Sequence, residues 1–147
     1  MRSLCAALAI ILLHSLPPVR AEQSERPAPP DAVVRLLANL ENVLAGGNVD
    51  AFRAIATPSV PDLAVMRFQM ATRGGPGARA ILRERSRRTI GEDVEVIADL
   101  LISREILGRV STWQILATPA AAGTYRIADV KELASVDGLL RLRGRRL

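Results

Sequence analysis

The feature that most constrains the fold is a series of alternating segments in the second half of the chain. Residues 93–103 repeat with a period of two, so one side of an extended chain carries Val94, Val96, Ala98, Leu100 and Ile102. Residues 109–118 are rich in β-branched and aromatic side chains, and residues 124–133 follow after a turn at 119–123. These segments predict consecutive antiparallel strands, of which the last two pair as a hairpin.

Helices are predicted before these strands. Residues 31–45 carry apolar side chains at spacings of three and four, with Asp31 as the N-cap and Gly46-Gly47 as the stop. Asn48 is expected to cap a second short helix over 49–56. Helices followed by a run of strands predict an α+β fold in which the N-terminal helices pack on one face of an antiparallel sheet.

Two segments of the domain have no single interpretation from the sequence. Residues 59–77 contain core material such as Phe68 but no clear period, and residues 78–90 fit either an Arg-rich helix or a strand. Residues Val136-Asp137-Gly138 predict a further turn, and residues 139–147 are expected to form a basic C-terminal tail.

The N-terminus resembles a secretory signal peptide. Arg2 precedes an apolar run over 4–13 that is too short to span a bilayer, and 19–21 resembles a small-x-small cleavage site. We therefore expect residues 1–21 to be removed and the protein to be secreted or periplasmic, with no membrane association afterwards. A lipid anchor would need a cysteine at the end of the apolar run, and Cys5 precedes that position, so no lipid anchor is expected. Residues 22–30 are interpreted as a proline-rich linker. The alternative is a buried N-terminal helix.

Loss of this leader would remove Cys5 and His14, the only cysteine and the only histidine in the 147 residues. The mature chain could then form neither a Ser/His/Asp triad nor a Cys/His dyad, and no cofactor or metal site is predicted. The remaining chain would carry a formal charge of +3, with arginines concentrated in the tail. No nucleic-acid-binding motif is recognised and few aromatic side chains are present for stacking, so we expect no nucleic-acid partner.

Two segments carry a resemblance to a known family. The helical opening through Ala45-Gly46-Gly47-Asn48-Val49 and the final STWQI…TYRIADVKEL resemble the nuclear transport factor 2-like (SnoaL-like) superfamily over residues 31–138. The resemblance implies N-terminal helices on a strongly curved, cone-like antiparallel sheet around a cavity. The C-terminal hairpin is also similar to the N-terminal module of large secreted bacterial peptidase-associated proteins, but no His-Glu-x-x-His motif is present, so no peptidase activity is transferred.

Five residues are candidates for a site. Asp99 or Asp129 could act as a base if buried among apolar neighbours, although ion pairing on a polar face is the more ordinary interpretation. Trp113 and Tyr125 could line a ligand cavity, although core packing is more common for such residues. Arg85 lies in an Arg-rich stretch that could bind an anion, or that could be a solvated face paired with nearby acids.

The sequence therefore predicts an exported, non-enzymatic binding or interaction module for a small apolar ligand or a protein partner. A homodimer through the open face of the sheet is a further hypothesis. The alternatives are a small cavity enzyme of the isomerase or hydratase type that uses Asp99 or Asp129, and a truncated, inactive relative of a peptidase-associated protein.

Overall fold

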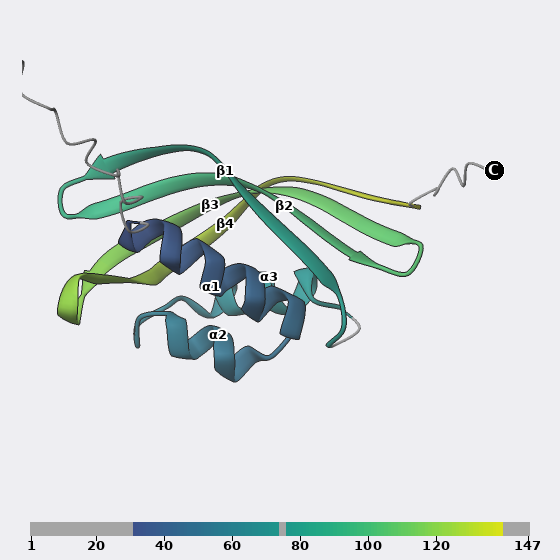
Figure 1. Ribbon diagram of the computed structural model, residues 1–147, viewed down its shortest axis with the longest axis horizontal. Helices are drawn as coiled ribbons and strands as arrows, with labels where there is room; N and C mark the ends of the chain where they lie inside the picture. Colours follow the sequence, from purple (N-terminus) through teal and green to yellow (C-terminus); the bar gives the residue numbers. More distant parts are fainter. Residues whose placement is uncertain (1–30, 74–75, 140–147) are drawn as a thin grey trace, which may run out of the picture.

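Three helices precede a four-stranded sheet in the computed structural model, which describes residues 31–73 and 76–139. The helices are α1 (Ala32–Gly46), α2 (Val49–Ile55) and α3 (Asp62–Ala71). The strands are β1 (Arg79–Ile90), β2 (Asp93–Arg104), β3 (Leu107–Ala120) and β4 (Thr124–Leu139), with a short 3₁₀ turn between the last two. Every strand pairs antiparallel with the next along the chain. Figure 1 shows the helices on one face of the curved sheet, which confirms the predicted α+β fold.

Helix α1 begins and ends where the sequence predicts. The Asp31 carboxylate accepts a hydrogen bond from the Val34 N–H at 2.9 Å, and Gly47 adopts the left-handed conformation at φ 63°. The Gly47 N–H donates to the Val43 carbonyl at 2.9 Å and closes the last turn. The apolar stripe faces the sheet and buries Val33, Leu36, Leu37, Leu40 and Leu44.

Helices α2 and α3 pack against each other, and α2 also packs on α1 and α3 on β4. Asn48 caps α2 by accepting hydrogen bonds from two backbone N–H groups. The rings of Phe52 and Phe68 stack with centroids 4.7 Å apart and join the two helices. Arg67 of α3 donates to the Val130 carbonyl of β4 at 2.7 Å. Helix α3 lies within the part of the sequence that showed no clear period.

The inner face of the sheet forms the other half of the core. Strand β2 alternates as predicted, and its inward residues are all buried. The strand interpretation of residues 78–90 is correct, because β1 pairs with β2 along its whole length. Register shifts interrupt β1 after Glu84 and interrupt the β3–β4 pairing at two places, and such bulges bend a sheet. Inward residues of β3 and β4 complete the core with Trp113, Ile115, Ala117, Ile127 and Val130.

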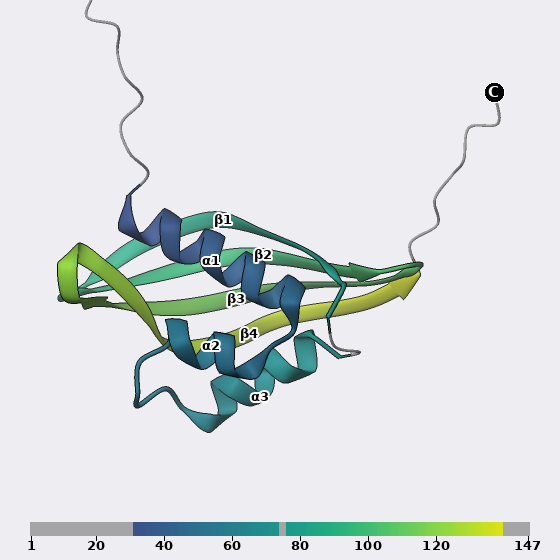
Figure 2. The same cartoon turned by 60° about the horizontal axis from the view of Figure 1, so that its bottom comes forward.

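The predicted turn at 136–138 is wrong. These residues continue β4, where Val136 pairs with Val110, Asp137 with Arg109 and Gly138 with Gly108. An ion pair between Arg109 and Asp137 adds a side-chain contact to this pairing. Strand β4 is therefore 16 residues long, and the sheet continues past the helices (Figure 2). The predicted leader and linker, and residues 140–147 of the tail, lie outside the described residues.

Candidate functional site

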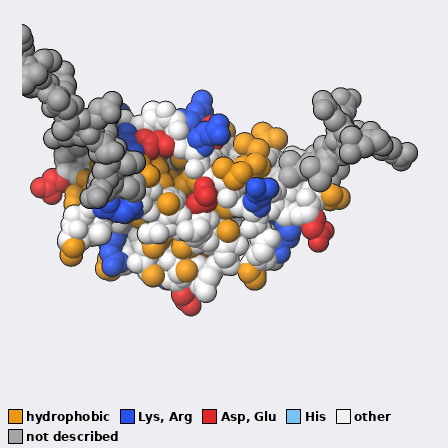
Figure 3. Space-filling view, in the orientation of Figure 1, with side chains coloured by type: hydrophobic (Ala, Val, Ile, Leu, Met, Phe, Trp, Pro, Cys, Tyr) orange, Lys and Arg blue, Asp and Glu red, His pale blue; other side chains and the backbone are white. Residues whose placement is uncertain are grey.

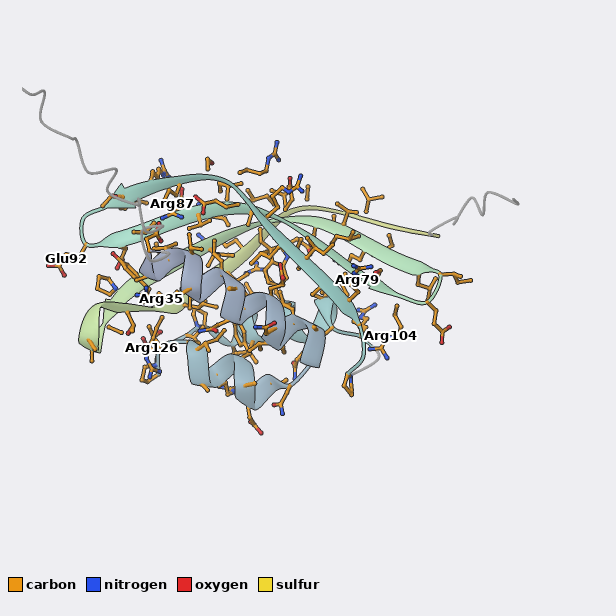
Figure 4. All side chains as sticks on the ribbon, viewed as in Figure 1. Arg35, Arg79, Arg87, Glu92, Arg104 and Arg126 are labelled. Atoms are coloured by element: carbon orange, nitrogen blue, oxygen red, sulfur yellow. The ribbon has the colours of Figure 1, made fainter. Side chains whose placement is uncertain are left out.

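A pocket lies at the end of the inner face, where the sheet continues beyond the helices. Its volume is about 450 Å³, within the range of small-molecule sites. The end of α3 forms one wall, and the β2–β3 hairpin and the end of β4 form the other. Figure 4 places Arg104 near this end of the sheet. Apolar lining is supplied by Met70, Ala71, Ile102 and Leu107.

Arg109 is the central charged group of this pocket. One terminal nitrogen, Nη2, donates to both Glu132 oxygens at 3.0 Å. The other, Nη1, donates to the two Asp137 oxygens at 3.1 and 3.3 Å. Arg109 and Asp137 line the pocket, whereas Glu132 lies five residues earlier in β4, opposite Trp113. Arg73 and Arg104 also line the pocket, so its charged lining is mainly cationic.

The protonation states of this cluster follow from its contacts. Burial by itself raises the pKa of Glu132, but hydrogen bonds from Arg109 and Ser135 and the charge of Arg109 outweigh it, so that the pKa lies below its ordinary value. Hydrogen bonding to Glu132 is the largest influence on the pKa of Arg109 and raises it. Arg109 and Glu132 are therefore both ionised at neutral pH.

Three polar atoms on the inner face of β3 are buried without a hydrogen-bond partner. They are Arg109 Nε, Ser111 Oγ and Trp113 Nε1, and they belong to successive inward positions of the strand. The Trp113 indole is near enough to Glu132 to help lower the pKa of that carboxyl, but the contact falls short of hydrogen-bond geometry. Such atoms are uncommon in folded proteins, and here they form a row that runs from the core toward the pocket.

Asp99 and Arg85 come together, but on the outer face of the sheet. The Arg85 guanidinium lies 3.5 Å from the Asp99 carboxylate, and the Thr112 hydroxyl donates to Asp99 at 2.9 Å. Asp99 occupies a strand position between two inward, buried residues, so its side chain points away from the helices. The pair therefore lies on the opposite side of the sheet from the pocket.

Asp129 also belongs to the outer face. Its carboxylate accepts a hydrogen bond from the Val130 N–H at 2.8 Å and lies 4.0 Å from the Lys131 ammonium. With Glu95, Gln114 and Leu116 these side chains border a recess of only about 60 Å³. A recess of this size is well below the volume of small-molecule sites.

Trp113 and Tyr125 do not share a site. Trp113 is fully buried in the core, whereas Tyr125 pairs with Pro119 at the other end of the β3–β4 hairpin. Tyr125 borders a second hollow of about 230 Å³ together with Arg35 and Arg126. Figure 4 shows these two arginines at the end of the molecule away from Arg104. Arg126 donates to the Ala56 carbonyl at 3.1 Å.

Sequence reasoning missed Arg109, Asp137 and Glu132. The signal that could have found Arg109 is strand parity, because residues 109, 111 and 113 face the same side once Trp113 is placed in the core. Glu132 and Asp137 could not be placed in this way, since the pairing of β3 with β4 shifts register at Thr112/Trp113 and at Leu116/Ala117.

Two further properties concern the described residues. They contain no cluster of three or more His, Cys, Asp or Glu side chains that could hold a metal ion. None of the helices over 31–73 and 76–139 has the length and apolar character needed to cross a membrane.

Comparison with solved structures shows the nuclear transport factor 2-like (NTF2-like) fold. A variant of the protein Rd1NTF2_05 has a TM-score of 0.53 at 12% identity, over 68% of this chain and 95% of that one. The CaMKII hub of S. rosetta has a TM-score of 0.54 at 16% identity, over 75% of this chain and 99% of that one. A conserved protein from Planctomyces limnophilus DSM 3776 has a TM-score of 0.52 at 7% identity, over 69% of this chain and 95% of that one. No model of a known protein family matches the chain. No curated protein matches it in sequence.

Proposed function

We propose that the chain is an exported, non-enzymatic binding module that holds a small, largely apolar molecule in the pocket between α3 and the ends of β2, β3 and β4. One observation carries this proposal: a cavity of about 450 Å³ with apolar side chains on both walls and, on one of them, Arg109 fixed by two carboxylates. Small-molecule sites have this composition, in which apolar surface supplies most of the affinity and a few polar groups fix orientation.

The placement of the candidate carboxylates supports binding over catalysis. A cavity enzyme that uses Asp99 or Asp129 would need one of these carboxylates inside the pocket, next to the bound molecule. Both lie on the outer face, where Asp99 is paired with Arg85 and Asp129 is near Lys131. The carboxylate that does line the pocket, Asp137, is engaged by Arg109.

A neutral apolar fluorophore, N-phenyl-1-naphthylamine, tests the pocket directly. Ile106 lies in the β2–β3 turn and Leu107 is the first residue of β3; both are 60% exposed, but only Leu107 lines the pocket. We expect the protein to bind the fluorophore and L107E to weaken binding about tenfold, which corresponds to ~1.4 kcal/mol. I106E, the matched control, should bind like the unmodified protein. An equal loss of fluorophore affinity in L107E and I106E, or no fluorophore binding by the unmodified protein, would contradict the proposal.

Export is part of the same proposal and has its own experiment. It rests on the order of Arg2, the apolar run over 4–13 and the cleavage pattern at 19–21. Expression of the full chain in a bacterial host, followed by N-terminal sequencing of the periplasmic or secreted product, should give a protein that starts within a few residues of Glu22. Retention of Met1 in the cytoplasm would contradict export.

We further propose that two copies associate through the outer face of the sheet. Ile81, Leu101, Val110 and Val136 lie side by side in register across all four strands. Ile81, Val110 and Val136 are exposed, and Val136 is 71% exposed. Figure 3 shows hydrophobic side chains gathered on the upper side of the molecule, above the sheet and away from the helices. A contiguous row of this kind marks an interaction surface more often than scattered apolar residues do.

Self-association can be measured by sedimentation velocity over a range of concentrations. V110E places a charge in the middle of the row and should convert a dimer to a monomer. Leu63 lies on α3 and is 48% exposed, so L63E adds the same charge outside the row and should leave the dimer unchanged. A monomer at all concentrations for the unmodified protein would refute the proposal.

A further inference from the structure

The two carboxylates on Arg109 are held in different environments. Glu132 contacts Nη2 with both oxygens at 3.0 Å, and its side chain is 26% exposed. Asp137 contacts Nη1 at 3.1 and 3.3 Å, but its side chain is 72% exposed and borders the pocket. Removal of Glu132 from Arg109 would leave a partly buried charge uncompensated, whereas Asp137 can move into water.

The ion pair between Arg109 and Asp137 is weak because the two groups lose little when they separate. Asp137 is 72% exposed and passes into water, and Arg109 keeps its contact with Glu132, so the pair resembles exposed pairs, which contribute about 0–1 kcal/mol in general. The Arg109 guanidinium remains tethered without Asp137, since Nη2 keeps its charge-assisted hydrogen bonds to both Glu132 oxygens. The Nη1 edge of Arg109 can therefore exchange Asp137 for another carboxylate at little cost.

We propose that Asp137 occupies the place of a ligand carboxylate, and that the pocket binds amphipathic carboxylates whose head group takes over Arg109 Nη1 while the apolar chain lies against Met70, Ile102 and Leu107. This inference rests on the proposed function of the pocket as a ligand site. Nη1 already holds a carboxylate by both of its oxygens, those of Asp137, and Arg73 and Arg104 add positive charge to the lining. Asp137 then acts as an internal competitor that the ligand must displace.

The experiment uses two molecules with the same chain length, decanoate and decanol, as competitors of N-phenyl-1-naphthylamine. Both are titrated against the unmodified protein, D137N and the matched control D129N, which removes a carboxylate from the outer face. D137N removes the carboxylate that competes for Arg109, so decanoate should bind this variant about fivefold more tightly than the unmodified protein. This factor corresponds to about 1 kcal/mol, the upper end of the range for exposed ion pairs. Decanol binding should not change, and D129N should behave like the unmodified protein.

R109K is the second variant. It keeps the positive charge and the salt link to Glu132 but loses the planar fork, so decanoate should bind more weakly than to the unmodified protein while decanol is unaffected. Four outcomes overturn the inference: decanoate and decanol respond alike to D137N; D129N tightens decanoate as much as D137N; decanoate fails to displace a bound fluorophore; or R109K leaves decanoate binding unchanged. Absence of fluorophore binding in every variant would instead overturn the proposed ligand site itself, together with this inference.

Discussion

The hydroxyl of Ser111 allows a direct test of how the inner face of β3 is built. Ser111 is 2% exposed, and its oxygen has no hydrogen-bond partner. A buried polar group without a partner costs about 1–3 kcal/mol relative to the same group in water. Ser111→Ala removes this cost and leaves a void no larger than a methyl group, which itself costs about 1 kcal/mol at most. We therefore expect S111A to stabilise the protein by about 1 kcal/mol.

Thr72 supplies a matched control, because its hydroxyl is also buried but has a partner. It is 6% exposed and donates to the Phe68 carbonyl at 3.0 Å at the end of α3. Thr72→Val keeps the shape of the side chain and removes this hydrogen bond, so it should destabilise the protein by about 1 kcal/mol. The two substitutions delete the same chemical group and are expected to change stability in opposite directions.

Urea unfolding followed by circular dichroism measures both free energies by linear extrapolation. The S111A transition should move to higher urea at an unchanged slope, with a rise in Tm of roughly 4 °C for a domain of this size. A loss of 1 kcal/mol in S111A would mean that the hydroxyl has a partner in solution. That result would refute the interpretation of the row formed by Arg109, Ser111 and Trp113 as unpartnered.

Three other substitutions test the fold and the charged cluster. Asn48→Ala removes the cap of α2 and should cost about 1 kcal/mol in urea unfolding, and a change below a tenth of that would contradict the capping role. Leu40→Ala, at a fully buried position of α1, should cost about 3 kcal/mol in the same assay, whereas an exposed substitution such as Ala38→Ser should cost far less. Glu132→Gln tests the lowered pKa of that carboxyl. Because the pKa of Glu132 in the folded protein lies below its ordinary value of 4.5, the ionised carboxylate stabilises the fold above pH 4.5. This stabilisation is lost as the pH falls through the folded pKa. The Tm of E132Q should therefore decline less steeply than that of the unmodified protein below pH 4.5, and parallel profiles would be inconsistent with this assignment.

Local signals were sufficient for most of the fold. Asp31, Gly47 and Asn48 mark helix ends through contacts within three or four residues, and these contacts are present in the structure. The alternation over 93–103 identified β2, because one face of that strand is buried and the other is not. Helix α3 carries a weaker signal, since exposed Leu63, Met66 and Met70 reduce the contrast between its two faces.

Strand β1 shows why local signals fail at a sheet edge. Its burial alternates only over its first half, and its second half is exposed. Arginines occupy both faces there: Arg87 is inward and bonded to Glu84 and Asp31, while Arg88 bonds to Glu95 on the outer face. A segment with charges on both sides has no apolar period, so only its pairing with β2 defines it as a strand.

The incorrect turn at 136–138 and the missed contact of Arg109 with Asp137 have the same physical cause. Val-Asp-Gly is a good turn sequence when only its neighbours in the chain are considered. In the structure this segment pairs with Gly108, Arg109 and Val110, which lie 26 to 30 residues earlier, and Asp137 there meets the guanidinium of Arg109. Extension of β4 past the helices also creates the open end of the inner face, where the pocket lies. Local sequence reasoning that places a turn at Asp137 therefore loses both the strand and the site, because the same long-range pairing produces them.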